Sequence, residues 1–295
     1  MFLTWCTTLL IGGAVGVVSQ GLYRTYRAES VGGGNELAAA PYQTQVRGPT
    51  QQENKAAIVI DDLGLDLKMA RKFCELEIPV TLAILPYQRH SKRVAREALR
   101  HGKEVILHLP LQPRDYPDVN PGTGALLLSM NREQIQTEVA QQLDALPGCV
   151  GVSNHMGSLF TEQEVQMRWV LSVLAERHLF FLDSLTTPHS ACRCVARELA
   201  VPFVRRTHFL DVERSEDAIV RQLCSLLDKA VQQGGAIGIA HPTVETLAAL
   251  PKVSAAFAEK GVRLVPVSDM VASHPPLVAR EQGAGIKGQG QKPDN

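Results

Sequence analysis

Eight polar side chains that could carry metal or acid-base chemistry stand at the ends of short apolar runs in this 295-residue sequence. They are Asp61, Asp62, His108, Asn154, His155, Asp183, Asp211 and His241. Each apolar run predicts a buried strand, so each polar side chain is expected at or near a strand end. The carboxyl ends of parallel strands meet at one face of an α/β fold, and active sites form there. The pattern therefore predicts a single site.

Imidazole and carboxylate groups together suit a divalent, zinc-like ion, which in catalytic sites keeps one position open for water. Asp62, His108 and His155 would supply one carboxylate and two nitrogens as ligands. Asp61 and His241 then become candidates for the general base and the general acid of a hydrolytic reaction. Asn154, Asp183 and Asp211 are candidates for contacts with the substrate; Asp183 and Asp211 could instead cap the segments that follow them.

The other candidates also have structural interpretations. Asp61 and Asp62 could cap a helix and a turn, and His108, with apolar neighbours on both sides, could be a hydrogen-bonded core histidine. The segment Ser153–Ser158 could form a structural turn, and His241 could belong to a turn that caps a helix at Thr243. The site interpretation is favoured because all of these residues stand at strand ends.

An alternation of short apolar runs and amphipathic stretches predicts the elements that position these side chains. The expected strands are Ala56–Asp62, Pro79–Pro86, Glu104–Leu111, Val150–Gly157, Phe180–Ser184, Phe203–Asp211, Ala236–Pro242 and Val262–Asp269. Thr161 and Glu164 predict a capping box, followed by a helix that buries Val165, Trp169, Val173 and Leu174. A second helix is expected from near Ser215 to Gly234–Gly235.

Repeated strand–helix units fit either a doubly wound open sheet or a (β/α) barrel. A doubly wound sheet usually carries a glycine-rich first turn, but Ile60–Gly64 stands at that place and contains no GxGxxG motif. The barrel, a single α/β domain over residues 55–272, is therefore the favoured fold.

Outside this domain the composition changes. Residues 1–27 begin with an apolar stretch that has no charge before residue 19, so we expect a signal peptide or a membrane anchor. Residues 28–54 are expected to form a flexible linker, and residues 273–295 a disordered tail. Together they predict a protein that is periplasmic, secreted or anchored to the inner membrane.

Overall composition excludes several classes of protein. Hydrophobic residues make up 45% of the chain and charged residues 20%, as in a globular protein. Lys plus Arg equals Asp plus Glu at 30 each, with no basic stripe among aromatic residues, so no nucleic-acid partner is expected. The six cysteines show no CxxC pairing and are expected to be small buried side chains, with an adventitious disulfide as the alternative.

At these residues the chain resembles the polysaccharide deacetylases, in particular their divergent branch from bacterial envelopes. The resemblance spans about Ala57 to Met270. It implies a distorted (β/α) barrel of about seven strands, with Asp61 as the base and Asp62 as a metal ligand. The segment Gly102–His108 is similar to the one that delivers the first ligand histidine, and Ile239–His241 is similar to the late motif with the acid histidine.

The resemblance also has a departure. A second ligand histidine is expected four residues after His108, where this chain has Gln112. The divergent branch is similar to this chain in its Asn-His-Met-Gly-Ser segment, from which we infer that His155 takes the place of the missing ligand.

These observations predict a metal-dependent hydrolase, with zinc as the favoured ion, that removes acetyl groups from an N- or O-acetylated envelope glycan, such as a peptidoglycan-type polymer. The substrate class comes from the resemblance alone. Two alternatives stay open: a metal hydrolase that acts on another amide or ester, and a catalytically degenerate barrel, favoured by Gln112, that binds glycan without turnover.

Overall fold

The computed structural model describes residues 53–272. The predicted leader and tail lie outside these residues, as does the predicted linker apart from Glu53 and Asn54. Asn54 already belongs to the first strand. None of the helices in residues 53–272 is long and apolar enough to cross a membrane.

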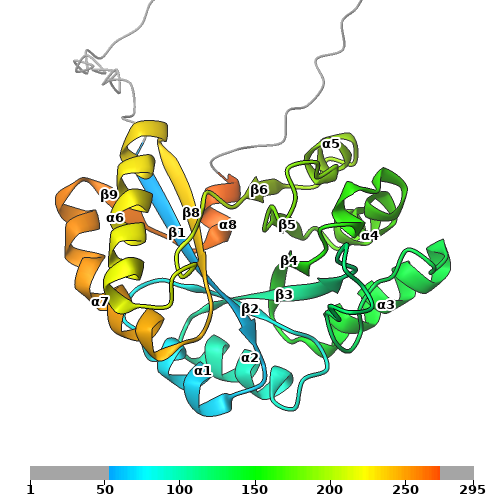
Figure 1. Cartoon of the computed structure of the whole chain (residues 1–295), viewed down its shortest axis with the longest axis horizontal. Helices are drawn as coiled ribbons and strands as arrows, with labels where there is room; N and C mark the ends of the chain where they lie inside the picture. Colours follow the sequence, from blue (N-terminus) through cyan, green and yellow to red (C-terminus); the bar gives the residue numbers. More distant parts are fainter. Residues whose placement is uncertain (1–52, 273–295) are drawn as a thin grey trace, which may run out of the picture. The chain divides into compact units, whose positions relative to one another are not determined.

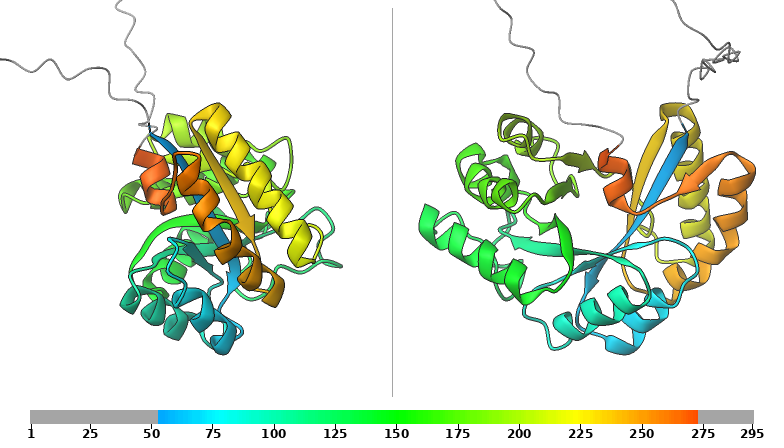
Figure 2. Two further views of the ribbon diagram at one scale, coloured as in Figure 1. Left: turned by 90° about the vertical axis from the view of Figure 1, so that its left-hand side faces the viewer. Right: turned by 180° about the vertical axis from the view of Figure 1, so that it is seen from behind.

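Nine strands in the described residues form one parallel sheet in the order β6-β5-β4-β3-β2-β1-β8-β7, with β9 paired to the start of β1. The strands are β1 (Asn54–Leu63), β2 (Thr81–Ile84), β3 (Glu104–Leu111), β4 (Cys149–Met156), β5 (Phe180–Asp183), β6 (Phe203–Arg205), β7 (His208–Phe209), β8 (Gly235–Ala240) and β9 (Val262–Leu264). The sheet curls into a half-barrel with helices around its outer side (Figures 1 and 2). This confirms the predicted α/β barrel architecture.

The half-barrel is open between β6 and β7, whose residues were predicted to form one continuous strand. The run Phe203–Asp211 divides into β6, which pairs with β5, and β7, which pairs with β8. The two short strands are thus the two ends of the sheet. Between them, Thr207 Oγ1 accepts a hydrogen bond from the backbone N–H of Ile237. The prediction of a single strand was wrong because an apolar run does not reveal which neighbour each part pairs with.

The helices α1 to α7 lie on the outer side of the sheet and connect successive strands, whereas α8 follows β9 and packs against the smaller cluster inside the half-barrel. The helices are α1 (Leu67–Cys74), α2 (Ser91–Arg100), α3 (Arg132–Ala145), α4 (Glu164–Glu176), α5 (Cys192–Glu198), α6 (Glu216–Gln233), α7 (Val244–Glu259) and α8 (Val267–Ala272), with a 3₁₀ turn at Phe160–Glu162. The predicted limits of α6 are confirmed, because Ser215 caps its first turn and Gly234 ends it in the left-handed conformation at φ 79°. The last predicted strand ends early at Leu264 and continues into α8, so its second half was wrong.

The prediction for α4 was wrong in its cap and partly wrong in its buried face. Gln163 is the N-cap residue, while Thr161 lies in the 3₁₀ turn and donates a hydrogen bond to the carbonyl of Gly157. Val165 is 55% exposed, whereas Met167 and Leu171 are fully buried. The 3₁₀ turn at Phe160–Glu162 moves the N-cap from the predicted Thr161 to Gln163. The side of α4 that faces the sheet therefore differs from the predicted one.

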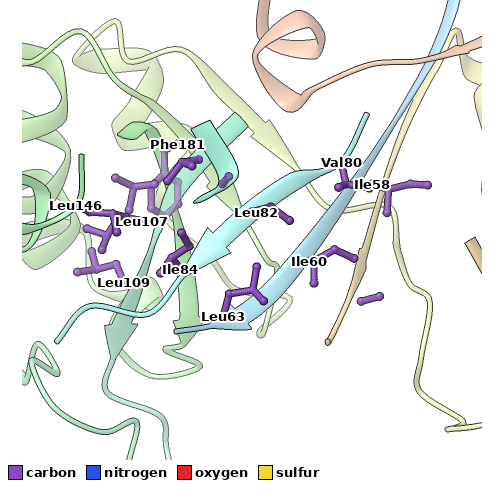
Figure 3. Packing of buried hydrophobic residues seen from close by; sticks show 14 of the residues in the cluster. Ile58, Ile60, Leu63, Val80, Leu82, Ile84, Leu107, Leu109, Leu146 and Phe181 are labelled. Atoms are coloured by element: carbon purple, nitrogen blue, oxygen red, sulfur yellow. The ribbon is translucent and has the colours of Figure 1, made fainter. Parts of the chain in front are cut away.

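Both faces of the central strands are buried, as expected for parallel strands covered on both sides. Ile58 and Ile60 of β1 belong to the large cluster between sheet and helices, which Figure 3 shows together with Leu82, Ile84 and Leu107. Ala57 and Val59 face the smaller cluster inside the half-barrel. This packing sets the strand register and places the polar strand ends at one edge.

Candidate active site at the carboxyl ends of the strands

The three predicted metal ligands lie together. Oδ1 of Asp62 is 2.8 Å from Nδ1 of His155 and 3.2 Å from Nε2 of His108, and those two ring nitrogens are 3.3 Å apart. Oδ1 of Asp62 is shielded from solvent, yet it has no hydrogen-bond partner among the described residues. Burial by itself would raise the pKa of Asp62, but the imidazoles of His108 and His155 outweigh burial and hold that pKa below its ordinary value.

This triangle fits a divalent ion. Ligand atoms held about 2.0 to 2.1 Å from a tetrahedral zinc ion lie about 3.3 Å from one another. The three observed separations run from 2.8 to 3.3 Å, so a small outward movement of the ligand atoms brings all three to the expected separation. Two nitrogens and one carboxylate oxygen also match the ligand types of catalytic zinc sites. Asp62, His108 and His155 are therefore the residues that could hold the ion.

Ser153 orients His108 and was missed in the sequence. His108 of β3 stands opposite Ser153 of β4, and Ser153 Oγ is 2.8 Å from His108 Nδ1. The hydroxyl can accept the Nδ1–H proton, which leaves Nε2 free to face Asp62. Ser153 is fully buried, and only the β3–β4 register reveals its partner. The sequence signal was its place one residue before Asn154.

Asp61 lies beside the triangle without joining it. Its Oδ2 is 3.5 Å from Nε2 of His108, and its Oδ1 is buried and has no hydrogen-bond partner within residues 53–272. Burial raises the pKa of Asp61 despite the opposing effect of His108. The alternation of side chains along a regular strand would place Asp61 and Asp62 on opposite sides. Instead, Asp62 has a left-handed backbone with φ 56°, within an irregular part of the β1–β2 ladder, and both carboxylates face His108.

His241 forms the opposite side of the site. Its Nε2 is 3.7 Å from Oδ2 of Asp62, and its Nδ1 is 3.0 Å from Oδ2 of the buried Asp211, which also accepts the backbone N–H of His241. The hydrogen bond that His241 Nδ1 donates to the Asp211 carboxylate raises the pKa of His241 to about 9, against the opposing effect of burial. Phe209 of β7 stacks on the imidazole ring with 6.4 Å between ring centroids.

The three predicted substrate contacts occupy supporting positions. Asn154 is 1% exposed; its amide donates to the carbonyl of Met156 and accepts the backbone N–H of Ser184, which joins the ends of β4 and β5. Asp183 accepts hydrogen bonds from Leu185 N and Ser190 Oγ, and burial raises its pKa. Asp211 positions His241. Direct contact of these residues with a substrate stays a prediction.

Gln112 does not face the metal triangle. Its side-chain oxygen accepts the backbone N–H of Leu128 at 2.8 Å, and its backbone N–H donates to the carbonyl of Leu126. The residue therefore fastens the long loop between β3 and α3. His155, delivered by the neighbouring strand β4, completes the triangle.

Backbone strain marks the same edge. Of the six non-glycine residues with left-handed φ angles in residues 53–272, four stand at or after the carboxyl ends of strands: Asp62 at 56°, Tyr87 at 55°, Met156 at 55° and Leu185 at 50°. Such angles are uncommon for non-glycine residues and gather at functional sites.

Comparison with known families agrees with this site. Residues 58–271 match the family model described as divergent polysaccharide deacetylase. The chain belongs to this family. The match spans the predicted barrel from β1 to α8, including every residue of the metal triangle.

Relatives of this deacetylase-family chain are found in bacteria. An uncharacterised protein of Haemophilus influenzae is 32% identical over 198 residues, which is 67% of this chain and 70% of the relative. The uncharacterised protein YibQ of Escherichia coli K12 is 31% identical over 199 residues, which is 68% of this chain but only 62% of YibQ. The crystal structure of the uncharacterised protein ATU2773 from Agrobacterium tumefaciens is similar with a TM-score of 0.70 at 28% identity, covering 76% of this chain and 91% of that one.

Proposed function

We propose that this protein is a metal-dependent hydrolase that removes acetyl groups from an N- or O-acetylated glycan of the bacterial envelope. The observation that carries the proposal is the triangle of Asp62, His108 and His155, whose ligand atoms are 2.8 to 3.3 Å apart beside a second carboxylate and a second imidazole. Family membership supports acetyl removal as the reaction. The apolar start of the sequence supports export to the periplasm, with or without a membrane tether.

The residues of the site have distinct tasks in this reaction. A divalent ion, zinc by its ligand set, would polarise the acetyl carbonyl and make water a better nucleophile. Asp61, 3.5 Å from His108 and outside the triangle, is placed to take the proton from the attacking water. His241, held by Asp211 on the other side, is placed to return a proton to the departing amine or alcohol.

Metal content and acetate release, measured on the same purified sample, test the proposal. We expect about one divalent ion per chain, release of acetate from acetylated envelope polysaccharide, loss of that release after chelation, and its return on adding zinc. A sample that holds metal and releases no acetate from any such glycan would contradict the proposal.

Two alternative functions predict different results in the same experiment. A glycan-binding barrel without turnover would retain the polysaccharide whether or not metal is present, and would release no acetate. A metal hydrolase of another specificity would cleave a simple ester or amide in a metal-dependent way while leaving the glycan acetylated. Gln112 does not favour the first alternative, because His155 would supply the third ligand atom in its place.

A further inference from the structure

Positive charge is concentrated on one part of the described chain. Residues 67–100, which include α1 and α2, contain eight Lys and Arg residues against three acidic residues. The other described residues contain sixteen Lys and Arg against twenty-three acidic residues. A cationic region thus lies on a domain that is otherwise acidic.

Seven of these cations are exposed, and we call them the basic flank: Lys68, Lys72, Arg89, Lys92, Arg93, Arg96 and Arg100. Arg100 pairs with Glu97, which also lies 3.8 Å from Arg71 of α1 and so links the two helices side by side. The remaining six form no ion pair among the described residues, although acidic side chains are in excess elsewhere on the domain. Their charge is therefore available to an external anion.

The part of the basic flank at the start of α2 opposes the stability of that helix. Lys92 and Arg93 lie in the first turn of α2, which contains no acidic residue and no side-chain cap. The N-terminal end of a helix carries partial positive charge, so cations there are unfavourable. Lys92, Arg96 and Arg100 also follow one another at intervals of four residues, where like charges repel. A local arrangement that opposes folding points to a role in binding.

The flank begins at the active site. Helices α1 and α2 follow β1 and β2 and therefore start at the edge of the sheet that carries Asp61 and Asp62. The backbone N–H of His90, directly before α2, donates to the carbonyl of Gly64 at 2.9 Å, two residues after Asp62. Helix α2 has 10 residues and extends about 15 Å away from this edge. Figure 1 shows α1 and α2 next to each other on the outer side of the sheet.

We infer that the basic flank binds the anionic groups of a polymer that runs outward from the catalytic site, so that the substrate is an acetylated glycan that also carries carboxylate or phosphate groups. The inference rests on the proposed function for the identity of the polymer as substrate. A row of cations that starts beside the metal triangle suits a strand with one unit in the site and its neighbours along α2. An anionic lipid surface is less suited, because residues 65–100 expose only three large apolar side chains, Leu65, Tyr87 and Leu99, beside the seven cations of the flank.

Binding measurements on the full chain test this inference without depending on turnover. The probes are polygalacturonate for carboxylates, polyglycerol phosphate for phosphates, and dextran as a neutral polymer. The flank variant carries Lys92→Gln, Arg93→Gln and Arg96→Gln. The matched control carries Arg193→Gln, Arg197→Gln and Lys260→Gln, which removes three exposed cations outside the flank.

We expect wild type to bind at least one anionic polymer, with an affinity that falls as salt rises, and to bind dextran much more weakly. The flank variant should lose at least about fivefold in affinity for the anionic polymer, and the control variant less than about twofold. The anionic polymer that binds more tightly shows whether the flank recognises carboxylate or phosphate groups. Equal losses in both variants, or equal binding of dextran, would overturn the inference.

Two further measurements distinguish this inference from binding to a membrane surface and from the proposed hydrolysis. Vesicles that contain anionic phospholipid are tested in parallel, and tighter binding to vesicles than to either polymer, lost in the flank variant, would overturn the inference in favour of a membrane surface. Acetate release is measured separately. If wild type released none while the flank variant alone lost polymer binding, the proposed hydrolysis would fail and the anion-binding surface would stand.

Discussion

At the scale of single residues, the adjacent pair Asp61 and Asp62 shows how one backbone angle divides chemical roles. Both carboxylates lie within 3.5 Å of Nε2 of His108, because the left-handed backbone at Asp62 interrupts the alternation of the strand. Only Asp62 also contacts His155, at 2.8 Å. Asp62 can therefore share an ion with both imidazoles, while Asp61 stays beside it with one oxygen unsatisfied.

This division predicts the effect of Asp61→Asn and of His241→Ala. Each change removes a proton-transfer group but leaves the metal triangle intact. We expect the turnover number for acetate release to fall by about 10² to 10⁴ fold in each variant, with the metal content of wild type. Asp228→Asn, a change at an exposed aspartate of α6, is the control and should keep full activity. Full activity in Asp61→Asn would remove the base assignment.

Ser153→Ala tests the positioning of His108. Without the hydroxyl 2.8 Å from Nδ1, the imidazole loses the partner that fixes its orientation and protonation. We expect metal affinity to fall by about 10- to 100-fold, measured by competition with a chelator. Ser153→Thr, which keeps the hydroxyl, should retain more affinity than Ser153→Ala. Ser172→Ala, on α4 away from the site, should leave affinity unchanged.

At the scale of elements, the strand register brings the site together, and helix ends determine its electrostatic surroundings. His108 meets Ser153 because β3 and β4 are in register at those residues, and His241 follows β8 directly after Ala240. Helix α2 begins at the same edge of the sheet, and its first turn contains Lys92 and Arg93. The partial positive charge at the N-terminal end of a helix favours anionic side chains at these positions. Stability and anion binding therefore make opposite demands on α2.

The opposition predicts that Lys92→Glu stabilises the domain. Glutamate in the first turn suits the helix dipole and forms an attractive pair with Arg96 four residues later, so we expect a gain of about 0.5 to 1.5 kcal/mol in the free energy of unfolding. Denaturant titration measures it. Lys72→Glu, the same exchange in the last turn of α1, should instead destabilise, since cations are favourable there. A lower free energy of unfolding in Lys92→Glu would contradict this prediction and show that Lys92 stabilises the folded domain.

At the scale of the whole molecule, one residue bridges the opening of the half-barrel. Arg206 lies between β6 and β7, and its guanidinium donates to the carbonyls of Ser184 and Leu185 at 2.7 and 3.0 Å. The same group lies 3.7 Å from the centroid of the Phe209 ring, which stacks on His241. The open edges of the sheet are thus connected to each other and to the active site.

Arg206→Ala tests this bridge. The change removes two charged hydrogen bonds from the carbonyls of the buried Ser184 and the half-buried Leu185, so we expect a loss of about 2 kcal/mol in the free energy of unfolding. The neighbouring Arg205 is exposed, and Arg205→Ala should change stability by less than about 0.5 kcal/mol. Urea titration of both variants makes the comparison. If the two variants lost similarly little free energy of unfolding, the backbone hydrogen bonds between strands would be sufficient to stabilise the open side of the half-barrel.

The sequence by itself determined the class of fold, most of the strands and the three residues that meet in the metal triangle. Buried parallel strands have nearly continuous apolar runs, so polar residues within them or at their ends stand out, and Asp62, His108 and His155 were recognisable for that reason. The limits of α6 also followed from local signals, because Ser215 and Gly234 act on their own helix.

Only the tertiary structure decided which partners these residues meet. Ser153 supports His108, Asp211 positions His241, and Gln112 fastens a loop, and each of these relations depends on pairing between segments far apart in the sequence. The division of Phe203–Asp211 between the two sheet ends has the same origin. Apolar periodicity reports that a residue is buried, whereas hydrogen-bond register and backbone dihedral angles determine what it faces, and those are set only when the sheet assembles.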